Sequence, residues 1–242
     1  MLTARLKRLG LKDGDRVLDL GCGEGRHVHG LYLLGNLKVF GVDLSDTSLK
    51  KAEEGLATLQ KPAHDHSGEV VFETGDATAL RFEDNTFDAV ICSEVLEHLP
   101  DYHAAIAEIQ RVLKPEGRLC ISVPHAWPER VCWQLAPPPN GYAFAPGGHI
   151  RIFDEVDLKV SVQRHGFKLF GRHHAHGIHV PYWWLKCAFW DREEDHPITK
   201  AYHNFLVWDL MKRPWITRFI DTLISPFMGK SLVLYFHSTK AS

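Results

Sequence analysis

Residues 17–27 read Val17-Leu18-Asp19-Leu20-Gly21-Cys22-Gly23-Glu24-Gly25-Arg26-His27. A short apolar run is followed by three glycines at alternate positions, and a helical pattern begins directly after them. Glycines at this spacing let the backbone turn sharply and let a ligand approach closely, because no Cβ stands in the way. The stretch therefore predicts a strand-to-helix turn of an α/β protein that receives a ligand.

The spacing of the glycines helps to choose the ligand. A dinucleotide-binding turn has the pattern G-x-G-x-x-G and holds a pyrophosphate at the helix N-terminus. Here Gly25 comes one position early, and Arg26 stands where the third glycine belongs. Asp19 also puts a carboxylate near the space of a pyrophosphate, which is electrostatically unfavourable. A cationic or zwitterionic ligand fits better, and a NAD-dependent oxidoreductase remains the alternative.

In these residues the sequence resembles the class I S-adenosylmethionine-dependent methyltransferases, whose first motif is similar to residues 19–25. The resemblance implies S-adenosyl-L-methionine as the cofactor and S-adenosyl-L-homocysteine as the product. It also implies a set of cofactor contacts within the turn: Asp19, Gly21, Cys22, Gly23 and Gly25.

An acidic residue ends the second predicted strand, residues 37–42. Asp43 lies 20 residues after Gly23, which suits a carboxylate that binds the two hydroxyls of a ribose. Dehydrogenases and methyltransferases share this feature, so it indicates a nucleoside without choosing the chemistry. The alternative role for Asp43 is to cap the next helix, but Ser45 can already do so. We expect Asp43 and the adjoining Leu44 to contact the cofactor.

Two further strand ends continue the resemblance. Residues 69–74 alternate like a strand and lead to Asp76, where the family has an acidic residue that accepts a hydrogen bond from the adenine amino group. A merely solvated turn aspartate is the alternative there. The apolar residues 87–92 predict a central strand, and the segment that follows, residues 93–99, is close to the family's common form. The resemblance thus adds four residues to the cofactor site: Asp76, Ala77, Ser93 and Glu94.

The predicted elements alternate in type and indicate a doubly wound α/β fold. Strands are predicted over residues 17–20, 37–42, 69–74, 87–92, 118–124, 166–172 and 231–237, and helices over residues 1–10, 26–34, 46–60, 101–113 and 154–164. The resemblance implies a Rossmann-like sheet of about seven mostly parallel strands, with the last strand antiparallel and a helical insertion before it. We expect a single domain, residues 1–242, with a cofactor-binding half over 1–124 and an acceptor-binding half over 125–242.

The second half carries the features expected for binding the methyl acceptor. All seven tryptophans lie beyond Pro124. Residues 125–152 are rich in proline and glycine and predict an irregular covering loop, and residues 177–229 predict the helical insertion. The G-H-x-R-x-F run that begins at Gly148 resembles a segment of family members that act on small molecules. The candidate acceptor contacts are Trp127, Tyr142, Arg151, Tyr182 and Trp183.

One face of the insertion is strongly apolar. Trp215, Phe219, Leu223 and Phe227 recur every four residues, which is the spacing of one helix face. The favoured interpretation is that this stripe packs over the sheet as core. The alternative is a lid over an apolar acceptor, presented from a membrane surface, so peripheral membrane contact stays open.

The resemblance implies transfer of a methyl group from a sulfonium, a reaction that needs few catalytic groups from the protein. A sulfonium carbon is already a strong electrophile, so an in-line SN2 displacement mainly needs alignment of the nucleophile and exclusion of water. A general base is needed only where a hydroxyl or another poorly ionised group is methylated, rather than a better carbon or nitrogen nucleophile. Histidine suits that role because it titrates near neutral pH. The candidates are His149 first, then His98 and His125.

Composition argues against several other classes of function. The formal net charge of −2 and the lack of a basic patch interleaved with aromatics disfavour nucleic-acid binding. Five cysteines without a C-x-x-C pair indicate reduced thiols and a cytoplasmic protein. No run approaches the roughly 20 apolar residues that span a bilayer.

No metal site is predicted from the sequence. His64 and His66 form an H-x-H pair without a third ligand nearby, and the histidines at 173, 174, 176 and 179 are left unassigned. An oxidoreductase is further disfavoured because no Tyr-x-x-x-Lys pair stands in the expected region, and a non-catalytic protein with this fold is the remaining alternative. The motifs together favour a methyltransferase for a small, apolar or aromatic acceptor.

Overall fold

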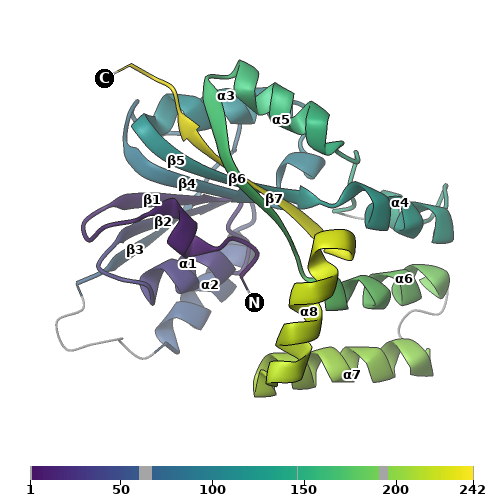
Figure 1. The fold of residues 1–242 in the computed structure, drawn as a ribbon. Coiled ribbons are helices and arrows are strands. Elements are labelled where there is room, and N and C mark those ends of the chain that lie inside the picture. Colours follow the sequence, from purple (N-terminus) through teal and green to yellow (C-terminus); the bar gives the residue numbers. More distant parts are fainter. Residues whose placement is uncertain (1, 60–66, 146, 191–195, 242) are drawn as a thin grey trace.

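The apolar run before the glycine turn forms the first strand of a buried sheet. In the computed structural model, which describes residues 2–59, 67–145, 147–190 and 196–241, Val17 and Leu18 are fully buried between parallel neighbours on both sides. The strands are β1 Arg16–Leu20, β2 Lys38–Asp43, β3 Glu69–Thr74, β4 Phe87–Ser93, β5 Leu113–Pro124, β6 Phe167–Ala175 and β7 Ser231–Ser238. Within the described residues they form one seven-stranded sheet in the order β3-β2-β1-β4-β5-β7-β6 (Figure 1).

The direction of the strands agrees with the predicted topology. β1 to β5 pair in parallel, and β7 runs antiparallel to both of its neighbours, β5 and β6. The predicted Rossmann-like sheet with an antiparallel last strand is therefore confirmed. The strand order reverses between β1 and β4, and in open α/β sheets ligands bind at the carboxyl ends of the strands beside such a switch.

Helices cover both faces of the sheet (Figure 1). They are α1 Arg26–Tyr32, α2 Asp46–Ala57, α3 Tyr102–Val112, α4 Ala126–Leu135, α5 Glu155–Arg164, α6 Val180–Ala188, α7 Pro197–Lys212 and α8 Trp215–Met228, with 3-10 turns η1 Leu6–Leu9, η2 Leu96–His98, η3 Tyr142–Phe144 and η4 Gly177–His179. One apolar core contains Val28 and Leu31 of α1, and another contains Ile106 of α3 and Leu158 of α5. The predicted helical insertion before the last strand is confirmed as α6, α7 and α8.

Several predicted boundaries were wrong. Of the helix predicted over residues 1–10, the described residues form only the turn η1, and Gly10 ends it with φ of 60°. β5 begins at Leu113, since residues 114–117 form an irregularity within the strand instead of a separate turn. The covering loop is helical over α4. The predicted helix 46–60 ends at Ala57, and its predicted end at Gln60, like His64 and His66, lies outside the described residues.

The prediction that the apolar stripe of α8 packs as core was also wrong. Trp215 is 78% exposed and Phe227 is 77% exposed, and the other members of the stripe are exposed as well. The opposite, polar side of α8 faces the protein instead. It does so because Asp221 accepts a hydrogen bond from the Ile178 amide at 3.0 Å, and Ser225 accepts one from the Gly177 amide at 3.1 Å.

Candidate functional site

The three glycines of the first turn have different structural tasks. All three have positive φ, namely 69° at Gly21, 52° at Gly23 and 82° at Gly25. A Cβ on Gly21 would lie 2.3 Å from Val95 Cγ2, and one on Gly25 would lie 2.8 Å from His29 Nε2. A Cβ on Gly23 would meet no atom within 4 Å. Packing therefore requires the outer two glycines, whereas Gly23 faces open space through which a ligand can approach.

Asp43 holds this turn in place from the end of β2. Its Oδ2 accepts a hydrogen bond from the Gly23 amide at 2.8 Å, and its Oδ1 accepts one from the Ser45 amide at 2.9 Å. Ser45 caps α2 through the Ser48 amide, as the sequence suggested. Each carboxylate oxygen keeps a second lone pair, so Asp43 can accept further hydrogen bonds from a sugar. Leu44 beside it is 77% exposed and offers an apolar surface.

Asp19 lies beneath the turn and is shielded from the space above it. Its side chain is buried, and neither carboxylate oxygen has a hydrogen-bond partner among the described residues. Burial raises the pKa of Asp19 to about 7, and burial lowers that of the neighbouring His27 to about 3. Cys22 is buried too, and burial followed by the charges of Asp19 and Asp43 raises its pKa. Asp19 can therefore influence a ligand only through its field.

The other predicted cofactor residues lie at the next strand ends. Asp76 is exposed and accepts hydrogen bonds from the Thr78 amide and hydroxyl, both at 2.8 Å, which lower its pKa. Ala77 beside it is half-buried.

Ser93 and Glu94 form a polar network at the end of β4. The Ser93 and Ser122 hydroxyls are 2.8 Å apart, and Glu94 Oε1 accepts a hydrogen bond from Ser122 at 2.9 Å. Glu94 Oε2 lies 3.5 Å from Lys230 Nζ. Glu94 also has φ of 58°, a left-handed backbone that is costly for a residue with a side chain.

A cavity connects the cofactor half with the insertion. Its volume is about 260 Å³, and its lining includes Arg26, which follows the glycine turn, Glu94 at the end of β4 and Trp183 of α6. Lys230 and Ser231 line it from the start of β7. A side chain from each half thus faces the same space, at the carboxyl ends of the strands.

A cluster of two histidines and two glutamates lies next to this region. The rings of His98 and His149 are 5.1 Å apart, and His149 Nδ1 lies 2.6 Å from Glu129 Oε1. Glu97 Oε1 lies 4.0 Å from His98 Nε2. Glu97 is fully buried, and burial followed by the charge of Glu94 raises its pKa well above its usual range. We call Glu97, His98, Glu129 and His149 the histidine–carboxylate cluster.

Aromatic rings extend from this cluster. The Tyr142 ring is 5.6 Å from the His149 ring and 6.0 Å from the Trp183 ring, and Lys230 Nζ lies 5.3 Å above Trp183. The structure thus brings together four predicted site residues from distant parts of the chain, His98, Tyr142, His149 and Trp183.

Four other candidates lie apart from this cluster. His125 Nδ1 donates to the Gly229 carbonyl at 3.0 Å, and the His125 ring stacks on the His174 ring. Trp127 is 40% exposed and donates to the Phe227 carbonyl at 2.8 Å. Arg151 donates to the Pro100 carbonyl and covers the Tyr102 ring, and Tyr182 leans towards His203 of α7. These four side chains contact neighbouring segments, and the Tyr182 ring also lies 5.9 Å from the Trp183 ring. Their roles at the acceptor site stay predictions.

Sequence reasoning missed Glu97, Glu129 and Lys230. Glu97 lies within the 93–99 segment, where its place next to His98 was a usable signal. Glu129 and Lys230 have no local signal, because the contacts that give them meaning join α4 to His149 and the start of β7 to Glu94.

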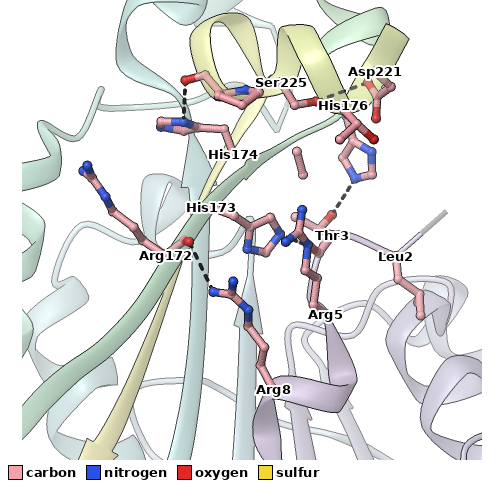
Figure 2. A pocket seen from close by; sticks show the side chains of 13 residues that line it. Leu2, Thr3, Arg5, Arg8, Arg172, His173, His174, His176, Asp221 and Ser225 are labelled. Atoms are coloured by element: carbon pink, nitrogen blue, oxygen red, sulfur yellow. Dashed lines mark hydrogen bonds between the residues drawn. The ribbon is translucent and has the colours of Figure 1, made fainter. Parts of the chain in front are cut away.

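The unassigned histidines of β6 line a separate cavity. Its volume is about 530 Å³, and it lies between the N-terminal segment, β6 and α8 (Figure 2). Arg5, Arg8 and Arg172 contribute cations, and burial together with Arg5 lowers the pKa of His173 to about 4. His176 is almost fully buried, bonds Thr3 and has a pKa lowered to about 2, chiefly by burial. Asp221 lines the same cavity, and Arg172 pairs with Glu155, so the cavity holds charges of both signs.

Comparisons with known proteins agree with the geometry. Residues 11–136 match the family model described as a methyltransferase domain. The chain is 36% identical over 121 residues to 27-O-demethylrifamycin SV methyltransferase of Amycolatopsis mediterranei (strain S699), covering 50% of this chain and 43% of that protein. It is also 36% identical over 114 residues to demethylmenaquinone methyltransferase of Staphylococcus aureus (strain MRSA252), covering 46% and 44%. The matched part thus spans less than half the length of these relatives.

A solved structure shares the fold over nearly the whole chain. It is an S-adenosylmethionine-dependent methyltransferase from Methanosarcina mazei, with a TM-score of 0.64 and 17% identity, covering 98% of this chain and 99% of that one. At this identity the likeness concerns the fold alone. Among the described residues, no helix has both the length and the apolar character needed to cross a bilayer.

Proposed function

Because the chain belongs to the class I S-adenosylmethionine-dependent methyltransferases, we propose that it methylates a small, apolar or aromatic acceptor. The observation that carries this proposal is the row of side chains from His98 through His149 and Tyr142 to Trp183. An aromatic wall beside two histidines suits a planar or apolar molecule that carries a polar atom. Two relatives are named for demethylrifamycin and demethylmenaquinone, which supports a small-molecule acceptor.

The residues of the glycine turn fit the cofactor. S-adenosyl-L-methionine supplies a methyl group on a positively charged sulfur, and S-adenosyl-L-homocysteine remains afterwards. Gly23 leaves open the space that a Cβ would fill, Asp43 has free lone pairs for the ribose, and Asp76 is exposed for the adenine. The buried, unpartnered carboxylate of Asp19 favours a cation above the turn. We infer that Gly21, Cys22, Gly25, Leu44, Ala77, Ser93 and Glu94 shape the rest of this site.

His149 is the candidate general base for a hydroxyl acceptor. Its Nδ1 hydrogen bond to Glu129 directs the Nδ1 proton to the carboxylate, which leaves Nε2 with a free lone pair. Nε2 would take the acceptor proton as the oxygen forms a bond to the methyl carbon. The carbon–sulfur bond breaks in the same step, and its electron pair stays on sulfur. His98, whose pKa is lowered by burial, is the second candidate.

Transfer of a labelled methyl group tests this proposal. The full chain and labelled S-adenosylmethionine are incubated with apolar phenols, hydroquinones, alcohols and amines. We expect product with at least one apolar hydroxyl compound, and a loss of about 10²–10⁴-fold in kcat for His149→Ala. Label that enters only protein or nucleic acid would overturn the acceptor class. Unchanged turnover in both His149→Ala and His98→Ala would overturn the base.

The other predictions about partners and location extend this proposal. No basic patch interleaved with aromatics supports a nucleic-acid acceptor. All five cysteines are free and buried, in line with reduced thiols, and a cytoplasmic location stays a prediction. Separation of the cell into cytoplasmic and membrane fractions, followed by detection of the chain, would test it.

A further inference from the structure

The histidine–carboxylate cluster has the donor arrangement of a metal site. Glu97, His98 and His149 each offer one ligand atom, and these atoms lie within 4.8 Å of one another. They come from η2 and from the segment before α5, so two separate parts of the chain meet there. Glu97 is fully buried, and neither of its carboxylate oxygens has a hydrogen-bond partner among the described residues. A buried carboxylate without a partner is costly, and a cation would remove that cost.

The hydrogen bonds of the two imidazoles also support a metal site. His98 Nδ1 lies 3.2 Å from the Gly148 carbonyl, and His149 Nδ1 lies 2.6 Å from Glu129 Oε1. Metal-bound histidines usually donate their second nitrogen to a carbonyl or carboxylate in this way. These contacts occupy Nδ1 in both rings and leave Nε2 as the nitrogen available to an ion.

We propose that Glu97, His98 and His149 bind a divalent first-row transition metal, with Glu129 and the Gly148 carbonyl orienting the two imidazoles. Two nitrogens and one carboxylate suit Zn²⁺, Mn²⁺, Fe²⁺ or Co²⁺ better than Ca²⁺. Ligand bonds of about 2.1 Å place ligand atoms about 3–3.5 Å apart, so the three side chains close inward by about 1 Å. The inference departs from the sequence analysis, which predicted no metal.

The ion would change how the acceptor is activated, and this part rests on the proposed function. With the imidazoles as ligands, an acceptor hydroxyl bound to the ion loses its proton to water more readily. Its oxygen then forms the bond to the methyl carbon while the carbon–sulfur bond breaks. His149 and His98 would in that case hold the ion and not act as bases.

Titration of the chelator-treated full chain with Co²⁺ tests the site, because bound Co²⁺ is visible by its absorption. We expect wild type to bind one more equivalent of Co²⁺ than Glu97→Gln does. Glu129→Gln should bind this equivalent of Co²⁺ about 10–100-fold more weakly than wild type. Glu53→Gln, an exposed substitution on α2, is the matched control and should behave like wild type. Equal binding by wild type and Glu97→Gln, or no binding by either, overturns the inference.

Calorimetry with S-adenosylhomocysteine separates this inference from the proposed function. A folded Glu97→Gln chain that binds S-adenosylhomocysteine normally and lacks the Co²⁺ equivalent supports the metal site. Wild type that binds S-adenosylhomocysteine without any Co²⁺ overturns the metal site alone. Wild type that binds Co²⁺ without S-adenosylhomocysteine overturns the proposed function alone.

A different observation concerns α7 and α8, whose apolar side chains are mostly exposed and whose polar side chains are in several cases buried. Their exposed side chains are largely apolar, and we call the following ones the outer face: Ile198, Phe205, Val207, Trp208, Met211, Trp215, Ile216, Phe219, Ile220, Leu223 and Phe227. The buried side chains include Asp209, which pairs with Arg218, and Thr217 and Ser225. A helix on the surface of a soluble protein normally buries its apolar side and exposes its polar side. The reverse arrangement here indicates that the outer face contacts an apolar neighbour.

The charges around the outer face indicate what that neighbour is. Within residues 197–228, which are all described, both carboxylates, Asp209 and Asp221, are engaged on the inner side, whereas Lys200, Lys212 and Arg213 are exposed. Lys200 lies in the first turn of α7, and Lys212 and Arg213 lie at its C-terminal end.

We propose that the outer face docks on a bilayer that contains anionic lipids. Apolar side chains with tryptophan and flanking cations are the usual requirements for interfacial binding. A second copy of the chain fits less well, because in a two-fold contact the same surface meets itself. The cations would then approach each other with no exposed carboxylate of α7 or α8 to compensate.

Flotation of the full chain with vesicles tests the docking. We expect binding to phosphatidylglycerol vesicles, little binding to phosphatidylcholine vesicles, and loss of binding in Met211→Ser/Trp215→Ser/Phe219→Ser. Lys212→Gln/Arg213→Gln should bind about 30-fold more weakly, and Val156→Ser, exposed on α5, should bind like wild type. The proposal is overturned if wild type does not bind the vesicles, or if the triple variant binds them equally well. It is also overturned if wild type is a dimer and the triple substitution makes it monomeric. Normal S-adenosylhomocysteine binding by the variants shows that they are folded.

Discussion

Replacing Gly23 with alanine separates the conformational role of the glycine turn from its role in admitting a ligand. Gly23 has φ of 52°, and a left-handed backbone costs an ordinary residue roughly 1–2 kcal/mol. The added Cβ meets no atom within 4 Å, so no overpacking adds to this cost. We expect the free energy of unfolding of Gly23→Ala to fall by about 1–2 kcal/mol, or several degrees in Tm.

Gly21→Ala is the matched comparison for this experiment. Its φ of 69° carries the same backbone cost. Its Cβ would also lie 2.3 Å from Val95 Cγ2, and overpacking adds about 1–3 kcal/mol. Gly21→Ala should therefore lose about 2–5 kcal/mol in total.

Urea unfolding without ligand measures these losses, and calorimetry with S-adenosylhomocysteine measures affinity. We expect Gly23→Ala to lose at least tenfold in affinity in spite of its small stability loss, because the methyl group enters the space of the cofactor. Wild-type affinity in Gly23→Ala would refute the inference that the cofactor approaches along this glycine. Equal stability of the two variants would refute the packing argument for Gly21.

Three further predictions follow from single side chains. Asp19 has a pKa of about 7 in the fold against 3.8 in the unfolded chain, so its ionisation costs stability as pH rises. From pH 4 to 7 the free energy of unfolding of Asp19→Asn should increase relative to that of wild type, by at most about 4 kcal/mol. Parallel curves of Tm against pH for the two proteins would contradict this. Trp183→Ala should raise the acceptor KM with little change in S-adenosylhomocysteine affinity, and equal losses of both would place Trp183 elsewhere. His125→Ala should lower the free energy of unfolding by about 1 kcal/mol and lower kcat less than twofold. A 100-fold loss of kcat in a stable variant would instead identify His125 as a base.

The parts of the fold that were predictable are those with a strong local signal. β3 was predicted with its observed bounds, because alternation and flanking polar residues agreed. α5 was predicted from its cap, and the Asp154 side chain indeed accepts a hydrogen bond from the Val156 amide. The glycine turn was predictable because its conformation depends on glycine itself.

The remaining features depend on contacts that local patterns do not contain. A period of four residues shows that Trp215 and Phe219 share a helix face, but not that this face points outwards. That direction follows from the hydrogen bonds of Asp221 and Ser225 to η4. Glu129 gains its role from His149, twenty residues away in sequence. Arg151 is a candidate acceptor contact in the sequence, but the structure shows its guanidinium donating to the Pro100 carbonyl and lying over the Tyr102 ring.

The most direct test of the account is a calorimetric titration of wild type and of Asp43→Ala/Asp76→Ala with S-adenosylhomocysteine and with NADH. Each carboxylate contributes hydrogen bonds worth about 1.5–3 kcal/mol to a bound nucleoside. The account predicts that wild type binds S-adenosylhomocysteine and not NADH, and that the double variant loses more than about 100-fold in affinity. Unchanged affinity in the double variant, or tight binding of NADH by wild type, would contradict it.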